Sequence, residues 1–277
     1  MLKNTLNSIS PLDGRYATKL RDLEQHFSEF ALIKNRVLVE INWLIFMSRT
    51  KSLSFVPTLS KNKETSLLKI IDEFSLKDAE QIKKIEAKTN HDVKAVEVFI
   101  GKKLESLNLK KYKEFVHLFC TSEDINNLSY SLMLKGYLDN EFKQINSSFL
   151  KDLKSKSKKW SKLSMLSFTH GQTASPTTLG KEIANFHERI KYHLNLLKSL
   201  NPSGKFNGAV GNYNAHVITD DKVNWQSLSE KFVKSLGLNW SKYSTQIELK
   251  DEMVTIISTM ENLNNVLLDL SKDCWLY

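Results

Sequence analysis

The stretch FTHGQTASPTTLGKE, residues 168–182, separates two long amphipathic segments of the chain. It places His170 beside Gly171, with hydroxyl and amide side chains around them, and Pro176 follows six residues after the histidine. Glycine and proline both disfavour a helix interior, so the sequence predicts a break here. A single histidine in a helical protein is ordinarily a surface residue or a satisfied core residue. The rest of the sequence therefore has to decide whether His170 takes part in chemistry.

Three long segments carry apolar residues at spacings of three and four, which keeps one face of a helix apolar. In chain order, these residues are Leu138, Phe142, Ile145, Phe149, Leu153 and Trp160; Leu179, Ile183, Phe186, Ile190, Leu194 and Leu197; and Met253, Ile256, Met260, Leu263, Leu267 and Leu270. The first helix is expected to begin near Thr121 or Ser122, either of which can cap it, and to extend over about forty residues. The second is expected to begin just after Pro176, at Thr177 and Thr178.

These patterns predict an all-α fold, because strand-like alternation is scarce and long helices bury their apolar stripes against one another. Residues 1–111 show shorter helical patterns and are expected to form an N-terminal helical domain. Residues 112–277 are expected to form an elongated long-helix bundle, interrupted by an irregular loop at 201–216. The third long segment is still in full pattern at Tyr277. The bundle is therefore expected to be incomplete, with a C-terminal domain absent.

Composition limits the class of protein. The 277 residues are 41% apolar and 26% charged, which suits a globular protein with a real core. No apolar stretch approaches the length of a membrane span, and the N-terminus has no apolar signal segment. The two cysteines, Cys120 and Cys274, form neither a metal-ligand pattern nor a disulfide framework. We therefore expect a cytoplasmic protein without a membrane association.

The formal net charge of +9 has three interpretations. A nucleic-acid surface is one, but the lysines are spread along the whole chain and no nucleic-acid module is present, so we expect no nucleic-acid partner. A lysine-rich solvated surface is the second. The third is attraction of a polyanionic small substrate, because a basic cleft concentrates anions.

Four short polar stretches lie outside the apolar stripes: SPLDGRY at 10–16, KTNHDVKAVE at 88–97, TSEDIN at 121–126 and THGQTA at 169–174. Several of them fall at helix starts, where free N–H groups bind carboxylates and phosphates. Thr121 and Ser122 are equally suited to simple capping, and His91 to a polar position without chemistry. The chain has no phosphate-binding glycine loop, dinucleotide fingerprint or metal-ligand spacing. Acid–base chemistry without a metal or cofactor is then expected, with His170 as the natural candidate because imidazole titrates near neutral pH.

Five segments resemble those of the bacterial adenylosuccinate lyase family, within the fumarase/aspartase superfamily: SPLDGRY, TNHDVKAVE, FCTSEDINNLS, THGQTASPTTLGKE and GKFNGAVGNYNAH. The resemblance extends from about residue 8 to the end of the chain. It implies an all-α fold of three domains, whose middle domain builds the central bundle of a homotetramer. It also implies cofactor-free β-elimination of fumarate from two small-molecule substrates of purine nucleotide biosynthesis, adenylosuccinate and the succinyl-carboxamide ribotide.

The resemblance also implies roles for individual residues. His170 would be the general acid that protonates the leaving nitrogen. His91, with Asn90 and Asp92, would line the nucleotide end of the site and help to orient that acid.

The remaining implied residues bind substrate. Arg15 and Tyr16 would hold the ribose phosphate, because a guanidinium matches phosphate oxygens. Thr121 and Ser122 would hold a succinyl carboxylate at a helix N-terminus. Gln246 would hydrogen-bond the substrate, and the loop at 205–214 would pack nearby, with Asn212 and Asn214 as weaker candidates.

One family feature has no counterpart in these 277 residues: the flexible loop whose serine is the general base. An isolated chain of this length is therefore expected to be impaired in turnover and poorly stable, because part of its apolar stripe is exposed. Two alternatives stay open. One is another lyase of the superfamily, acting on argininosuccinate or a carboxymuconate. The other is a helical binding or assembly module without catalysis.

Overall fold

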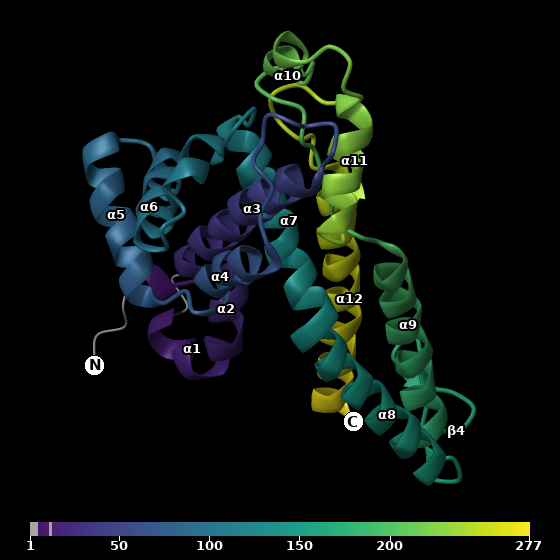
Figure 1. The fold of residues 1–277 in the computed structure, drawn as a ribbon. Coiled ribbons are helices and arrows are strands. Elements are labelled where there is room, and N and C mark those ends of the chain that lie inside the picture. The colour runs from purple at the N-terminus through teal and green to yellow at the C-terminus, as the bar shows by residue number, and fades with distance from the viewer. Residues whose placement is uncertain (1–4, 11–12) are drawn as a thin grey trace. The chain divides into compact units, whose positions relative to one another are not determined.

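The computed structural model describes residues 5–10 and 13–277. The chain divides into two compact units, which are described one at a time: unit 1 comprises Met1–Tyr137 and Pro202–Lys250, and unit 2 comprises Leu138–Asn201 and Asp251–Tyr277. Helices dominate the described part of both units (Figure 1). The all-α prediction is therefore confirmed. Among the described residues, no helix combines the length and the hydropathy needed to cross a membrane.

Unit 1 is an assembly of helices that range from 4 residues in α2 to 21 residues in α3. Its α-helices are α1 Asp13–Leu20, α2 Glu24–Phe27, α3 Glu29–Arg49, α4 Lys61–Asp72, α5 Leu76–Thr89, α6 Asp92–Ser106, α7 Ser122–Tyr137, α10 Asn214–Thr219 and α11 Trp225–Ser235. Short 3-10 turns are η1 Thr5–Asn7, η2 Arg21–Leu23 and η3 Lys110–Phe115. Pro11 and Leu12 of the predicted SPLDGRY motif lie outside the described residues.

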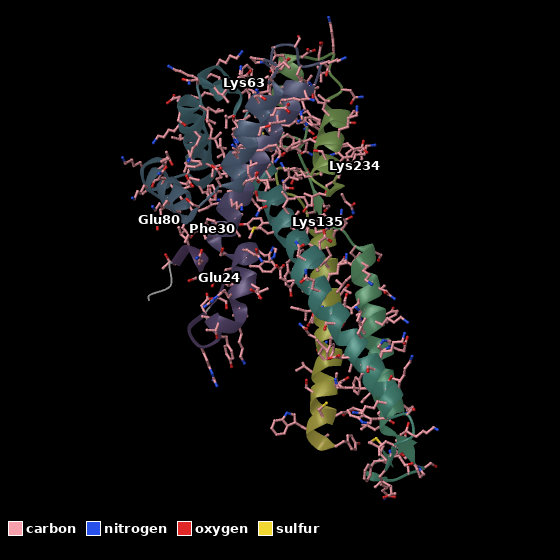
Figure 2. All side chains as sticks on the ribbon, turned by 60° about the horizontal axis from the view of Figure 1, so that its bottom comes forward. Glu24, Phe30, Lys63, Glu80, Lys135 and Lys234 are labelled. Atoms are coloured by element: carbon pink, nitrogen blue, oxygen red, sulfur yellow. The ribbon has the colours of Figure 1, made fainter. Side chains whose placement is uncertain are left out.

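Helix α3 is central to unit 1 because it is apolar around most of its circumference. A helix of this kind has to be covered on more than one side. One side packs into a core shared with α4, α5 and α6, which includes Val37 and Leu44. Phe30 of α3, labelled in Figure 2, packs against this first core.

The other side of α3 builds a second core with residues far away in the sequence. The ring of Trp43 lies 4.5 Å from the ring of Phe206 and 5.0 Å from that of Phe232, centroid to centroid. This contact draws the segment 202–250 into unit 1. The two-unit division consequently does not coincide with the boundary near residue 111 that the sequence predicts, and that boundary stays a prediction.

Unit 2 contains three long helices, α8 Lys143–Lys159, α9 Leu179–Ser199 and α12 Asp251–Leu276. The short π-helical segment η4 Leu138–Phe142 directly precedes α8. Because α7, η4 and α8 follow without a non-helical residue, the long helical run predicted from Ser122 is present to Lys159. Within the unit, α9 lies beside both α8 and α12 (Figure 1). Gly180 permits the close approach of α9 to α8, since a Cβ there would collide with backbone atoms of Ser157 and Ser161.

A short antiparallel arm joins α8 to α9. Strand β1 Ser164–Met165 pairs with β4 Thr177–Thr178, and β2 Phe168–Thr169 pairs with β3 Gln172–Thr173. Between the two pairs, the Ala174 amide donates to the Ser167 carbonyl at 2.8 Å. The helix resumes as predicted, with the Thr178 hydroxyl accepting the Lys181 amide at 3.2 Å. The predicted break is therefore a hairpin, which the sequence did not specify.

The segment 201–216 differs in part from the predicted irregular loop. It contains β5 Ser203–Gly204, paired in parallel with β6 Asn239–Trp240, and its last residues already belong to α10. Its middle is buried rather than exposed, since Lys205, Phe206 and Asn207 are almost fully covered. Helical hydrogen bonding from Asn214 and burial against the second core explain both differences.

Candidate active site

Helix α6 begins at His91, one of the predicted catalytic residues. Asn90 ends α5 in the left-handed conformation, with φ of 50°, and the chain turns directly into α6. His91 caps α6 because its Nδ1 accepts the Lys94 amide at 3.2 Å. With Nδ1 acting as acceptor, the ring hydrogen of neutral His91 belongs on Nε2. An imidazole thus takes the place of the usual Ser, Thr, Asp or Asn cap.

The free edge of His91 points at helix α7. Its Nε2 lies 3.3 Å from the Ser122 Oγ, so the Nε2–H donates to the hydroxyl at the first residue of α7. The His91 ring is exposed and Ser122 is half-buried. The structure therefore brings two of the predicted site residues together at two adjacent helix N-termini. Such ends carry unpaired N–H groups and attract anions.

Asp92, which was predicted to contact substrate, is engaged by the protein. Its Oδ2 lies 2.6 Å from Arg36 Nη2, and its Oδ1 accepts the Val93 amide at 2.8 Å. Arg36 Nε donates to Asn126 Oδ1 at 2.8 Å as well. Both carboxylate oxygens of Asp92 are thus already occupied in this structure.

Asp124 organises the start of α7. Its carboxylate accepts the Thr121 amide at 2.9 Å and the amides of Asn207 and Gly208, each at 3.1 Å. The ammonium group of buried Lys205 lies 2.8 Å from Oδ1. A carboxylate with four donors fastens the 205–208 segment to the helix that presents Thr121 and Ser122.

The loop that carries Gln246 is attached to the same network. The Asn207 amide group donates to Ser244 Oγ at 2.8 Å, two residues before Gln246. Gly211 allows the close approach, because a Cβ there would collide with the carbonyl oxygen of Ser244. Gln246 itself is exposed. Asn207 therefore links the Gln246 loop to Asp124 and to the N-terminus of α7.

Arg15 and Tyr16 lie on an exposed face of α1. The Arg15 guanidinium carbon is 5.4 Å from the centre of the Tyr16 ring. Both side chains are exposed, and no described hydrogen bond or ion pair joins them to His91 or Ser122. Their phosphate-binding role stays a prediction. Asn212 and Asn214 are both exposed, near the start of α10.

His170 belongs to unit 2 and forms the tip of the hairpin. His170 and Gly171 are the two central residues of the turn, with φ of 53° and 74°. Positive φ at both positions is the requirement of a type I′ turn. A histidine in this region is uncommon, and glycine is the usual choice. The conformation projects the exposed imidazole at the end of the arm, beside Thr169 and Gln172.

Sequence reasoning missed a third histidine, His117, which lies four residues before Thr121. His117 Nδ1 lies 2.6 Å from Oε1 of Glu40, and its backbone amide donates to Oε2 at 3.1 Å. Burial lowers the pKa of His117, but the hydrogen bond and the charge of Glu40 outweigh burial and raise the pKa above its ordinary value. The available signal was Glu40 itself, a lone carboxylate in the apolar run VLVEINWLIF, residues 37–46.

The thiol of Cys120, three residues after His117, is held in its protonated form. Burial raises the pKa of Cys120 well above its ordinary value, with further increases from Glu40 and Asp124. Within residues 5–10 and 13–277, no three His, Cys, Asp or Glu side chains are grouped as a metal site requires. What the arrangement offers is anion binding at helix ends and proton transfer by imidazole.

Unit 2 thus carries an exposed histidine on an arm between long helices, and unit 1 carries a His–Ser pair at two helix N-termini. The model of the lyase family matches residues 14–277, and the chain belongs to this family.

Curated relatives are similar along the whole chain. It is 42% identical to the adenylosuccinate lyase of Buchnera aphidicola subsp. Schizaphis graminum, over 99% of this chain and 60% of the relative. It is 43% identical to that of Legionella pneumophila strain Corby, over 100% and 61%, and 41% identical to that of Escherichia coli K12, over 99% and 60%. The chain therefore spans about 60% of the length of these relatives.

Solved structures support the fold. A fumarate lyase from Mesorhizobium sp. BNC1 superposes with a TM-score of 0.76 at 17% identity, over 94% of this chain and 57% of that one. A β-carboxy-cis,cis-muconate cycloisomerase from Acinetobacter calcoaceticus sp. ADP1 gives 0.73 at 20% identity, over 95% and 59%.

Proposed function

We propose that this chain carries the fumarate-eliminating chemistry of an adenylosuccinate lyase. In the reaction, the bond between the succinyl carbon and the purine amine breaks. A proton leaves the neighbouring succinyl carbon, and the departing nitrogen gains a proton. Adenylosuccinate yields AMP and fumarate, and the succinyl-carboxamide ribotide yields the carboxamide ribotide and fumarate.

One observation carries the proposal: identity of about 42% to a bacterial adenylosuccinate lyase along 99% of this chain. The grouping of His91 with Ser122 at two helix N-termini supports it, because the succinyl carboxylates and the phosphate are anions. The solved structures support the fold alone, so they do not choose among lyase substrates.

We carry the roles of the individual side chains over from the family resemblance. His170, exposed on its arm, is the general acid for the leaving nitrogen. His91 and Asn90 meet the nucleotide, and Thr121 and Ser122 bind a carboxylate. Asp92 acts indirectly, through its ion pair with Arg36.

The remaining assignments complete the substrate-binding surface. Arg15 and Tyr16 bind the ribose phosphate, and Gln246 donates a hydrogen bond to the substrate. We assign the proton-abstracting base to the serine loop of the family, which has no counterpart among these residues. We also propose a homotetramer in the cytoplasm. Apolar side chains left exposed on α12 support association, among them Val254, Ile257 and Leu268.

An absorbance assay of adenylosuccinate cleavage tests the proposal. It compares this chain with the same chain extended by the C-terminal part of the Buchnera relative. Turnover by the extended protein alone would support both the reaction and the location of the base. Turnover by the 277-residue chain would leave the reaction standing and move the base to a residue of this chain. Failure of both folded proteins would overturn the proposal.

Two other functions remain to be separated from this one. Cleavage of argininosuccinate in place of adenylosuccinate by the extended protein would indicate a different lyase of the family. Binding of AMP without release of fumarate, even in the extended protein, would indicate a binding module. The specific similarity to adenylosuccinate lyases favours the first proposal.

A further inference from the structure

Arg36 is a nearly buried cation at the base of the His91–Ser122 pair. It lies on α3, and only 7% of its surface is exposed. Its guanidinium spans two other helices, donating from Nη2 to Asp92 at the start of α6 and from Nε to Asn126 in the first turns of α7. The two hydrogen bonds measure 2.6 and 2.8 Å.

We propose that Arg36 is a positioning residue that fixes the N-termini of α6 and α7 relative to each other, and so sets the surface on which His91 and Ser122 meet an anion. The inference rests on the proposed function for the identity of that anion, a substrate carboxylate or phosphate. The role of Arg36 in holding the two helix N-termini does not depend on the proposed function. Arg36 itself does not touch the substrate.

The chemistry of the side chain supports this role. A guanidinium is planar, so its Nε and Nη2 donors keep a fixed separation and direction. Asp92 directly follows His91, and Asn126 lies one turn after Ser122. Locking Asp92 and Asn126 to one rigid group therefore limits how far His91 and Ser122 can separate.

The contact between His91 and Ser122 is too weak to fix the two helices by itself. The contact between His91 Nε2 and Ser122 Oγ is 3.3 Å, at the long end for a hydrogen bond, and the His91 ring is exposed. A weak contact between an exposed ring and a half-buried hydroxyl does not hold two helices in register by itself. A buried arginine with two charge-assisted or polar partners does so more rigidly.

Stability alone is a weaker explanation for Arg36. Burying a guanidinium removes its hydration, and a well-packed apolar residue can replace a buried ion pair with little loss of stability. The Asp92 side chain is 41% exposed, so solvent screens the attraction. The main contribution of Arg36 is therefore to fix the relative positions of Asp92 and Asn126, rather than to raise the free energy of unfolding.

The test compares Arg36→Met and Arg36→Lys with Arg49→Met in this 277-residue chain. Arg49 is the control for the loss of an arginine with two paired donors, because it also donates from Nε and Nη2 to a carboxylate, that of Glu64, at 2.7 and 2.5 Å, from a side chain that is 63% exposed. That pair has no connection to His91. Two quantities are measured on protein shown to be folded: the ¹⁵N NMR signals of the His91 ring and the Kd of adenylosuccinate, whose succinyl carboxylate is the anion assigned to Ser122.

Loss of one hydrogen bond to a charged ligand group corresponds to about tenfold to a hundredfold in affinity. We expect Arg36→Met to weaken adenylosuccinate binding by at least about tenfold and to change the His91 ring signals, whereas Arg49→Met should change neither. Arg36→Lys should fall between, since an ammonium keeps the charge but not the fork. If Arg36→Met does not fold, Arg36→Lys decides by the same two readouts.

The outcomes separate the two proposals. Unchanged His91 signals and unchanged adenylosuccinate affinity in a folded Arg36 variant would overturn the positioning role. Equal losses in the Arg36 and Arg49 variants would also overturn it, because they would indicate a general effect on folding. If the unaltered chain binds no adenylosuccinate, the proposed function loses support for this chain. The His91 signals still decide the role of Arg36.

Discussion

The ammonium group of Lys205 lies 2.8 Å from Oδ1 of Asp124, and the two side chains are only 0% and 1% exposed. The pair is completed by hydrogen bonds on both sides. Lys205 donates to the Gly208 carbonyl at 3.1 Å, and Asp124 accepts three backbone amides. A buried charge is tolerated only when it is paired and hydrogen-bonded in this way. The pair therefore determines how the 205–208 segment attaches to α7.

Replacing Lys205 with methionine should destabilise unit 1 strongly. The change leaves the Asp124 carboxylate buried without its counter-ion, which typically costs about 3–5 kcal/mol. The free energy of unfolding from urea titration measures the effect. Lys234→Met is the matched control, because Lys234 on α11 (labelled in Figure 2) makes an exposed pair with Glu230, whose loss should cost only about 0.3–0.5 kcal/mol. Similar losses in the two variants would contradict the assigned importance of the buried pair.

His216 should make the protein sensitive to acid. Burial among the rings of Phe119, Tyr213 and Trp225 lowers the pKa of His216 to about 4. In unfolded chains the imidazole binds a proton near pH 6.5, so between about pH 6.5 and 4 only the unfolded state is protonated. Stability should therefore fall as the pH falls through this window, by on the order of 3 kcal/mol.

The variant His216→Phe tests this dependence. It keeps an aromatic ring and removes the titrating group, and Nδ1 of His216 has no hydrogen-bond partner among the described residues. The free energy of unfolding is measured at pH 7.5, where the comparison reports packing alone, and then at lower pH. The loss below pH 6.5 should be smaller in the variant. An equal loss in both proteins would assign the acid sensitivity to other groups.

His117 should make the protein less stable as the pH rises above neutrality. The pKa of His117 is raised in the folded state, so the folded protein holds this proton more tightly than the unfolded chain. The stabilisation is fully present below about pH 6.5 and is lost as the pH rises through the raised pKa. Urea titrations at pH 6, 7 and 8 should therefore show declining stability.

The variant Glu40→Gln sharpens this prediction. It removes the negative charge that raises the pKa of His117 and leaves a neutral amide oxygen as the acceptor, so that burial, which lowers the pKa, gains weight. The slope of stability against pH between 6 and 8 should then flatten or change sign. An unaltered slope would show that Glu40 is not the cause.

The sequence predicted the helices well because their information is local. Apolar spacing placed the long helices, and Pro176 with the two threonines located the start of α9 at Thr178. His91 was correctly placed at a helix start for the same reason. These features depend on residues within one or two turns of each other.

The sequence could not supply the polar contacts beneath the site. Arg36 pairs with a residue 56 positions away, and the Glu40–His117 pair spans 77 positions. No periodic pattern connects residues at such separations. The strands of the hairpin are also only two residues each, too short for a pattern of alternation to reveal.

Gly171 should control the order of the hairpin. Its φ of 74° is unfavourable for alanine by about 1–2 kcal/mol, although a Cβ there would meet nothing within 4 Å. Gly171→Ala should therefore speed hydrogen exchange of the Ala174 amide, which bonds to Ser167 across the arm, by about fivefold or more. Gly171→Asn should exchange more slowly than Gly171→Ala, because asparagine tolerates this conformation. Equal rates in glycine and alanine forms would indicate that the turn does not limit opening.

His170→Asn separates the imidazole from the turn that holds it. Asparagine suits the left-handed conformation at φ of 53°, so the hairpin should persist, as the exchange of the Ala174 amide can verify. Loss of a general acid typically lowers turnover by about 10²–10⁴-fold. In the extended protein we expect kcat for adenylosuccinate to fall by that factor while KM changes little. Gly171→Ala, which loosens the arm but keeps the imidazole, should lower kcat far less. Near-normal kcat in a folded His170→Asn protein would remove His170 from the mechanism, and the two histidines of unit 1 nearest Ser122 and Thr121, His91 and His117, would then be the groups to test.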